Sequence, residues 1–365
     1  MVVDLILVGF GNVARRFVRL LEERGQVLRA GHDLSTRVIG IATRRHGCAR
    51  DLRGLDAGRA LRLVEAGESI QGLDERTGDS IALNRTRGAG HDMSSEVFIR
   101  DAVGEARRRD PGRPVVVVET TVLDIERGQP AIDHVRAALE GGAHVISANK
   151  GPVAFAAREL METAARHRRA FFFEGAVMDG IPIFNLVRET LPAVSITGFR
   201  GVVNSTTNHI ITAMETGGEF GAALAEMQTA GIAEADASFD VDGWDAAAKT
   251  AALINVLMGG DVTPHDIDRT GIGDLTGAAV RDAVARNRRV KLVAAAARQD
   301  GRVTGRVAPE ELPASDLLAT LDGQQNALVL QTDLLGDIAI VQRGSGLTQT
   351  AYALVSDLVA VRRRL

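Results

Sequence analysis

The sequence predicts an α/β protein with a parallel sheet in its first part and an α+β arrangement in its second. Short apolar runs alternate with helical patterns over the first 150 residues, which is typical of parallel strands covered by helices on both faces. Beyond that point the strands lengthen and the regular alternation is lost. With 365 residues, the chain has room for about two domains.

The first strand is predicted at residues 2–8, and a glycine turn follows it at once. The turn reads Gly9-x-Gly11-x-x-Ala14 and opens a helical pattern. The first glycine permits a tight turn, the second lets the backbone approach a pyrophosphate, and the small third residue lets helix and strand lie close together. A second strand at residues 37–42 completes a βαβ unit, so we expect a Rossmann-type dinucleotide-binding domain. A glycine-containing turn without a ligand is the alternative.

Further strands extend this predicted sheet. Those at residues 115–118 and 144–147 flank a helix at 132–140, which ends at two glycines. We therefore place the dinucleotide-binding domain at residues 1–150. Within it, residues 49–113 give only weak patterns.

The second part begins with a predicted helix at residues 154–167. Long strands are predicted at 195–203 and 328–341, with helices between them. These features indicate an α+β domain at residues 151–342. Residues 343–365 are predicted to form a C-terminal helix that returns to the dinucleotide-binding domain.

The composition excludes several classes of protein. The net charge is -4, whereas a nucleic-acid-binding protein usually carries a basic excess. The single cysteine, Cys48, excludes an intramolecular disulfide and a Cys-rich zinc site. The N-terminus lacks the features of a signal peptide, and no apolar stretch approaches the roughly 20 residues that cross a bilayer. We therefore expect a cytoplasmic protein with neither nucleic-acid nor membrane partners.

Two arginines after the second predicted strand bear on the choice of cofactor. Proteins of this fold that bind NAD usually carry an acidic residue there, which holds the ribose hydroxyls. This chain has Thr43-Arg44-Arg45 instead, and an arginine at that point suits a 2′-phosphate. NADP is therefore favoured over NAD, with a pair of solvated surface arginines as the alternative.

Lysine is rare in this chain, because only Lys150, Lys249 and Lys291 of its 43 basic residues are lysines. A lysine can shift its pKa and move a proton, whereas an arginine stays protonated. Lys249 lies in a nearly apolar helical stretch that we expect to begin after an N-cap at Asp242, and it shares one helix face with Asp245. A buried pair of this kind indicates a catalytic group, with a structural ion pair as the alternative.

The other two lysines differ in their surroundings. Lys150 follows a strand of the predicted parallel sheet, and ligands bind beyond the carboxyl ends of such strands, so we expect it to face cofactor and substrate. Lys291 stands in an arginine-rich stretch that reads as a helix, and we expect it at the surface. Carboxylates within residues 234–242 precede the Lys249 helix. They either bind a substrate ammonium or form an ordinary acidic loop.

Motifs that follow one another along almost the whole chain resemble those of the homoserine dehydrogenase family. The most specific run is Ala230-Gly231-Ile232-Ala233-Glu234, followed by Asp240-Val241-Asp242-Gly243-Trp244-Asp245-Ala246-Ala247-Ala248-Lys249. Residues 147–152, 174–182, 204–208 and 344–346 match further landmarks. The resemblance is to a short, monofunctional form without an appended regulatory domain.

This resemblance implies the reversible NAD(P)-dependent reduction of L-aspartate 4-semialdehyde to L-homoserine. It makes Lys249, Asp245 and Lys150 the expected catalytic residues, with Lys249 as proton donor to the aldehyde oxygen. The expected substrate-binding residues are Glu234, Asp240, Lys150, Asn204 and Thr206. The expected cofactor contacts are Gly9, Gly11, Asn12, Val13, Arg44, Arg45, Thr120, Thr121, Lys150 and Gly346.

The resemblance also implies a homodimer formed through the second domain. It further implies a sodium site, built largely of backbone carbonyls, at Glu174, Val177, Asp179 and Ile181.

Four positions depart from the family's pattern on the expected substrate side. Ala235 and Ala237 stand where prolines are common, Ser205 replaces a glycine and His209 replaces a tyrosine. These changes leave open an NADP-dependent dehydrogenase of the same fold that acts on another small amino-acid aldehyde or hydroxy acid. An NADP-binding sensor without turnover is a third hypothesis.

Overall fold

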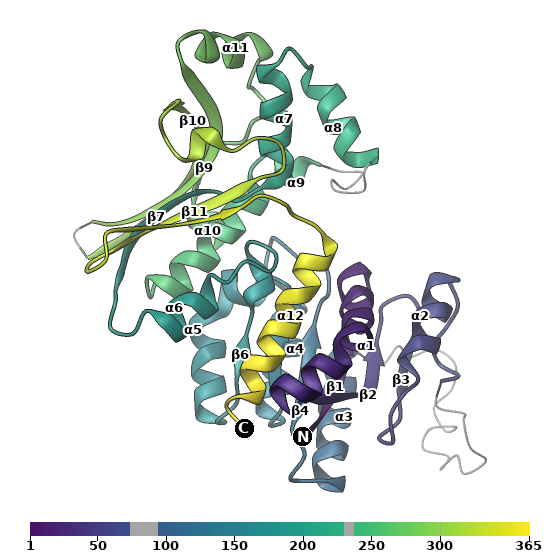
Figure 1. Cartoon of the computed structure of the whole chain (residues 1–365). Helices are drawn as coiled ribbons and strands as arrows, with labels where there is room; N and C mark the ends of the chain where they lie inside the picture. Colours follow the sequence, from purple (N-terminus) through teal and green to yellow (C-terminus); the bar gives the residue numbers. More distant parts are fainter. Residues whose placement is uncertain (74–93, 230–236, 300) are drawn as a thin grey trace.

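The computed structural model describes residues 1–73, 94–229, 237–299 and 301–365, which form two sheets flanked by helices (Figure 1). Both chain ends lie beside the first sheet, and the second sheet occupies the other end of the molecule. The predicted fold class, a Rossmann-type sheet followed by an α+β part, is confirmed.

The first sheet has the order β3-β2-β1-β4-β5-β6. Its strands are β1 (Val2–Val8), β2 (Ser35–Ala42), β3 (Cys48–Arg50), β4 (Val115–Glu119), β5 (His144–Ser147) and β6 (Phe171–Phe172). All neighbours are parallel except β3, which pairs antiparallel with β2 at the edge. The chain moves outward from β1 to β2 and then returns to β4 on the other side of β1. This switch point is where open α/β sheets bind ligands, at the carboxyl ends of their strands.

Helices cover both faces of the first sheet. They are α1 (Asn12–His32), α2 (Ala57–Glu65), α3 (Ser95–Arg109), α4 (Ala131–Glu140), α5 (Gly151–Arg166) and α12 (Leu347–Arg362). The apolar residues of α1 and α12 share one buried cluster with alternate side chains of β1. Those of α3, α4 and α5 pack against the opposite face, in a cluster that continues into the second part of the chain. The last helix therefore lies beside the first one, as Figure 1 shows.

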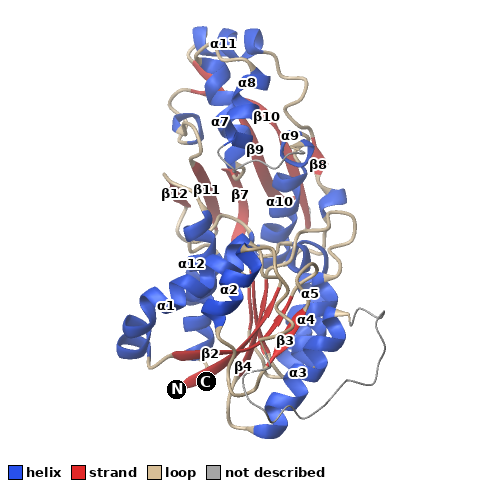
Figure 2. Ribbon diagram, turned by 90° about the vertical axis from the view of Figure 1, so that its right-hand side faces the viewer, coloured by secondary structure: helices blue, strands red, loops and turns tan. Residues whose placement is uncertain are grey.

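The second sheet has the order β12-β11-β7-β9-β10-β8. Its strands are β7 (Ile196–Val202), β8 (Asp268–Arg269), β9 (Arg288–Gln299), β10 (Arg302–Pro313), β11 (Asn326–Thr332) and β12 (Asp337–Gln342). The helices of this part are α6 (Phe184–Thr190), α7 (Ser205–Glu215), α8 (Phe220–Thr229), α9 (Ser238–Val241), α10 (Trp244–Leu257) and α11 (Gly277–Ala285). Figure 2 shows α7, α8 and α10 in front of the strands of this sheet and α11 at their far end.

The single long strand predicted at residues 328–341 is wrong, because two antiparallel strands, β11 and β12, occupy this region. The chain reverses between Thr332 and Gly336, where Gly336 has a φ of 71° and the Thr332 hydroxyl donates to its carbonyl. The turn itself is apolar, since Leu334 and Leu335 are 69% and 56% exposed. The two leucines of the turn extended the apolar pattern of the strands, which is why the sequence predicted one strand instead of two.

Lys291 is buried in the second sheet, so the prediction of a surface helix is wrong. It lies in the central strand β9 and its side chain has no exposed area. The ammonium donates to the Leu321 carbonyl at 2.6 Å and lies 3.7 Å from a carboxylate oxygen of Glu215. Burial lowers the pKa of Lys291, with the attraction of Glu215 as an opposing contribution.

Among the residues that the structure describes, no helix is long and apolar enough to span a membrane.

Lys291→Ala should lower the free energy of unfolding by about 2–4 kcal/mol, because it leaves a cavity and removes the donor of a buried carbonyl. Urea unfolding would measure this change. Arg281→Ala, which removes an exposed side chain of α11, is the control and should stay within about 0.5 kcal/mol of the wild type. Equal effects of the two substitutions would contradict the structural role of Lys291.

Candidate active site

Two lysines from different parts of the chain share one carboxylate. Asp245 lies in the first turn of α10, and its Oδ2 is 2.8 Å from Nζ of Lys249, one helical turn later. Its Oδ1 is 3.0 Å from Nζ of Lys150, which directly precedes α5. The helix begins after Gly243, whose φ is 81°, so the N-cap predicted at Asp242 is wrong. Asp242 belongs instead to the turn that closes α9.

Asn204 connects this cluster to a second carboxylate. It is the N-cap of α7, and its side-chain oxygen accepts a hydrogen bond from the Thr207 backbone at 2.8 Å. That bond fixes the orientation of the amide, so its nitrogen faces the acids. It donates to Asp240 at 2.7 Å and to Asp245 at 2.9 Å. Asn204 therefore holds two acidic side chains close together.

The electrostatics of the cluster keep Asp245 charged. Burial alone would raise the pKa of Asp245, but the charges of Lys150 and Lys249 outweigh it and the net shift is downward. For Lys249, burial would lower the pKa, and the attraction of Asp245 reverses this to a net rise. The pKa of Asp240 is raised by burial and by the nearby charge of Asp245. The site therefore holds protonated Lys249 beside an acid, Asp240, that favours a cationic partner.

The ammonium of Lys249 also donates to the Val203 carbonyl at 2.7 Å. An ammonium has three N–H donors, and the contacts with Asp245 and Val203 engage two of them. One donor therefore stays available for an oxygen atom that binds at this site.

The glycine turn leaves open space at the switch point of the first sheet. Gly9 has a φ of 83°, and a Cβ there would lie 2.8 Å from the backbone of Thr120. A Cβ on Gly11 would meet nothing within 4 Å. Gly11 precedes α1 without a side-chain cap, so the backbone N–H groups of Asn12 and Val13 open this helix unpaired by a side chain. The donor set fits a pyrophosphate, as at other helix N-termini of this fold.

Arg44 and Arg45 are exposed just beyond β2. The turn that carries them is closed by the Thr43 hydroxyl, which donates to the Gly47 carbonyl at 2.9 Å and accepts from the His46 backbone at 2.8 Å. No carboxylate of the described residues forms a salt bridge with either arginine. Their guanidinium groups therefore fit a phosphate at this corner.

The comparisons with known proteins agree with these features. The family model for homoserine dehydrogenase matches residues 182–359. The chain is 34% identical to a homoserine dehydrogenase of Methanocaldococcus jannaschii, over 98% of each chain. It is also 34% identical to an NAD(+)-dependent homoserine dehydrogenase of Pseudomonas canavaninivorans, over 98% of this chain and 96% of the relative.

The chain belongs to the homoserine dehydrogenase family. A crystal structure of a putative homoserine dehydrogenase from Archaeoglobus fulgidus matches with a TM-score of 0.81 and 27% identity, over 99% of each chain. A homoserine dehydrogenase from Thermoplasma acidophilum shares the fold, with a TM-score of 0.77 over the full length of each chain.

The remaining residues expected from the family's pattern are distributed as follows. Thr206 is buried in the first turn of α7, and Gly346 precedes α12. Thr121 follows β4 beside Thr120, whose hydroxyl donates to the Gly9 carbonyl at 3.0 Å. Glu234 and Ala235 lie outside the described residues.

A buried network beneath Lys150 was missed by the sequence analysis. Glu119 ends β4 with no exposed area, and it accepts hydrogen bonds from the Thr121 backbone at 3.1 Å and from the Ser147 hydroxyl at 3.4 Å. Asn149 donates to the Thr121 carbonyl at 3.0 Å and accepts from the Gly151 backbone at 2.8 Å. These bonds link the carboxyl end of β4 to that of β5, which Lys150 follows closely. The only sequence signal was an acid at the end of a fully apolar strand.

The segment expected to bind sodium offers backbone carbonyls rather than side chains. The Glu174 carboxylate accepts hydrogen bonds from the backbone N–H groups of Ile183, Phe184 and Asn185 at 2.6–2.9 Å. Asp179 accepts from the Thr350 hydroxyl at 2.8 Å. Within the described ranges, no group of three or more His, Cys, Asp or Glu residues is arranged to hold a metal. The carboxylates of Glu174 and Asp179 are therefore both engaged in hydrogen bonds within the protein.

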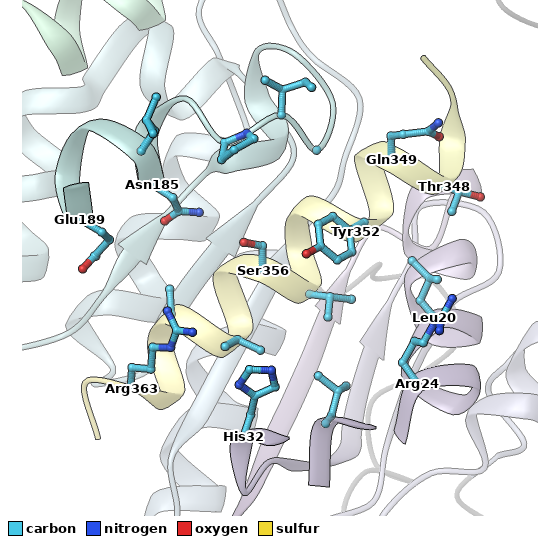
Figure 3. A pocket seen from close by; sticks show the side chains of 18 of the residues that line it. Leu20, Arg24, His32, Asn185, Glu189, Thr348, Gln349, Tyr352, Ser356 and Arg363 are labelled. Atoms are coloured by element: carbon cyan, nitrogen blue, oxygen red, sulfur yellow. The ribbon is translucent and has the colours of Figure 1, made fainter. Parts of the chain in front are cut away.

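A groove with a volume of about 1040 Å³ runs along α12, between that helix, α1 and α6. Figure 3 shows Tyr352 and Ser356 of α12 in this groove, with His32 of α1 and Asn185 of α6 on its walls. Neither Lys150 nor Lys249 lines it, so this groove is separate from the lysine cluster.

Asp245→Asn should lower the free energy of unfolding at neutral pH by about 3–5 kcal/mol, because two lysines then lack their shared carboxylate. The pKa of Asp245 is lowered in the folded protein, so its stabilising effect is present above the unfolded value of about 3.9 and is lost at lower pH. The deficit of the variant should therefore shrink below about pH 4, as urea unfolding at a series of pH values would measure.

Asp242→Asn is the matched control, because Asp242 is exposed three positions earlier. It should change the stability by no more than about 0.5 kcal/mol. A deficit of Asp245→Asn that stays constant from neutral to acid pH would contradict the role of its charge.

Proposed function

We propose that this chain catalyses the reversible NADP-dependent reduction of L-aspartate 4-semialdehyde to L-homoserine. The observation that carries this proposal is the shared carboxylate of Asp245, which brings Lys249 of the second part to Lys150 at the carboxyl edge of the parallel sheet. Membership of the homoserine dehydrogenase family supports the substrate pair. A sensor without turnover would have no use for two lysines in this arrangement.

Lys249 is the proposed proton donor. A nicotinamide cofactor held at the glycine turn of Gly9 and Gly11 would supply the hydride for the aldehyde carbon, and the carbonyl oxygen would take up the electron pair. Lys249 then gives this oxygen a proton, which completes the alcohol and leaves a neutral amine. Lys150 places a second positive charge near the forming alkoxide. Asp245 keeps both ammonium groups in position and, by raising the pKa of Lys249, ensures that it enters the reaction protonated.

Asp240 is the proposed partner of the substrate's ammonium group. Its carboxylate is oriented by Asn204 and lies in a largely buried environment, where an added positive charge is strongly stabilising. Glu234 and Thr206 are the further substrate contacts that the family's pattern supports. The replacement Ser205 stands next to Asn204 and accepts a hydrogen bond from Asn326 at 2.8 Å, which ties its side chain to the second sheet.

We also propose a homodimer through the second domain, as the family's pattern implies. Ala295, Arg200, Val329 and Ala339 lie side by side across four strands of the second sheet, on the face away from the helices. Val329 is buried there against Leu318 and Leu321 of this chain, so the exposed part of the face that is left for a dimer contact lies near Ala339. Sedimentation as a monomer would contradict the proposal of a homodimer.

We further propose, from the family's pattern, a sodium ion held by carbonyls of residues 174–181.

Lys249→Arg should lower kcat by about 10²–10⁴, because arginine keeps the charge but does not release its proton. The measurement is NADP reduction with L-homoserine at alkaline pH, and NADPH oxidation with aspartate semialdehyde. The wild type must turn over in both assays. Protein that binds NADPH but turns over neither substrate would overturn the proposed function, and near-normal activity of the variant would overturn the role of Lys249.

Arg44→Ala should weaken the binding of NADPH by about tenfold or more while leaving NADH nearly unchanged, because one charge-assisted bond to the 2′-phosphate is lost. Fluorescence titration with each cofactor would measure the two affinities. Arg59→Ala, in the nearby helix α2, is a control that should affect neither cofactor. Equal losses for both cofactors would place the 2′-phosphate elsewhere and favour the NAD dependence for which the Pseudomonas canavaninivorans relative is named.

A further inference from the structure

A second basic pocket lies at the opposite edge of the parallel sheet from the cofactor site. It opens where β4, β5 and β6 begin and has a volume of about 150 Å³. Its polar lining includes Arg107, Arg113, His144 and Arg169. Both chain ends lie at this edge of the molecule (Figure 1). No residue assigned to substrate, cofactor or sodium borders it.

Arg107 and Arg169 form the charged part of this pocket. Among the described residues, neither guanidinium has an acidic group within the 4.0 Å of a salt bridge. Nε of Arg169 is buried and has no hydrogen-bond partner there. Burial lowers the pKa of Arg169, and the positive charge of Arg107 lowers it further. Two cations therefore lie close together with no described acidic group within salt-bridge distance, although the pocket is also bordered by the chain ends, Met1 and Leu365.

The position of Arg107 depends on the turn after α4. Its Nη1 donates to the Gly141 carbonyl at 2.9 Å, which caps the end of that helix. Gly142 has a φ of 86°, and a Cβ on it would lie 1.7 Å from the same nitrogen. Capping of α4 explains why one N–H of Arg107 lies where it does. It does not explain why Nε of Arg169 is buried without a partner.

His144 contributes a donor rather than an acceptor. Its Nδ1 accepts a hydrogen bond from the backbone N–H of Ala170 at 3.0 Å, so Nδ1 carries no proton. Burial, assisted by the charge of Arg169, lowers the pKa of His144 to about 4, which keeps the ring neutral at physiological pH. The proton of the neutral ring must then be on Nε2. The polar atom that the ring has left to offer is therefore an N–H donor.

We propose that this pocket binds a small inorganic oxyanion, with phosphate as the matching chemistry. The donors are the guanidinium of Arg169, whose Nε has no partner, the N–H groups of Arg107 that the Gly141 carbonyl leaves over, and an imidazole N–H, which together complement several oxygens of one anion. The volume equals that of about five water molecules, which suits a single oxyanion and is too small for a nucleotide. The bound anion would join the end of α3, the turn after α4 and the start of β6.

Isothermal titration calorimetry of the whole chain with inorganic phosphate, at constant ionic strength, tests this proposal. We expect saturable binding with one site at the arginine pocket. Arg169→Gln should weaken it by about tenfold or more, because one charge-assisted hydrogen bond is lost. Arg107→Gln serves as a second variant if the first does not fold. Neither the readout nor the variants depend on turnover.

Two controls separate this pocket from other basic surfaces. Arg108→Gln removes an exposed arginine next to Arg107 and should leave the affinity for phosphate unchanged. Arg44→Ala removes the phosphate contact proposed at the cofactor edge and should also leave this site intact. Absence of saturable binding by the wild type would overturn the proposal. So would an affinity equal to that of the wild type in both Arg169→Gln and Arg107→Gln, or loss of binding in Arg44→Ala.

Discussion

The carboxylate of Asp245 is the interaction on which the arrangement of the site depends. Lys150 is anchored to the parallel sheet and Lys249 to a helix of the second part, and each would repel the other without the negative charge between them. One side chain therefore sets the distance between Lys150, at the carboxyl edge of the first sheet, and Lys249 of α10. Asn204 reinforces this by fixing the same carboxylate from a third direction. The two lysines are thus positioned by contacts between the first and the second part of the chain.

Those parts of the protein that depend on local pattern could be predicted from the sequence. The glycine turn identified β1, α1 and β2, and the four-residue spacing of Asp245 and Lys249 placed both on one helix face. Contacts between distant segments could not be predicted from residues alone. Asn204 reaches the acids because α7 starts beside α10, and nothing near it in the sequence indicates this. The same holds for Glu119, whose partners lie on the next strand and in a following loop.

Lys291 shows that a lysine in this arginine-rich chain can have a structural role as well as a catalytic one. Lys150 and Lys249 lie at the site, where a group that can release a proton has a use. Lys291, unlike these two partly exposed lysines, is inaccessible to solvent, and it contacts a single backbone carbonyl and the carboxylate of Glu215. A compact ammonium fits such a space, whereas a planar guanidinium would need more partners. The composition showed that the three lysines are unusual. Only the helices and strands around each lysine distinguish the two at the candidate active site from Lys291, which has a structural role.

The place of α12 has a consequence for how the protein is made. Its apolar residues, such as Leu354 and Leu358, complete the cluster that covers β1 and α1, although nearly the whole chain separates them. During synthesis the face of the first sheet that carries α1 therefore stays incompletely covered until residues 347–362 have been made. All strands of the second sheet are made before that helix. The first sheet, although its first strand is made at the outset, is therefore the later of the two to be completed.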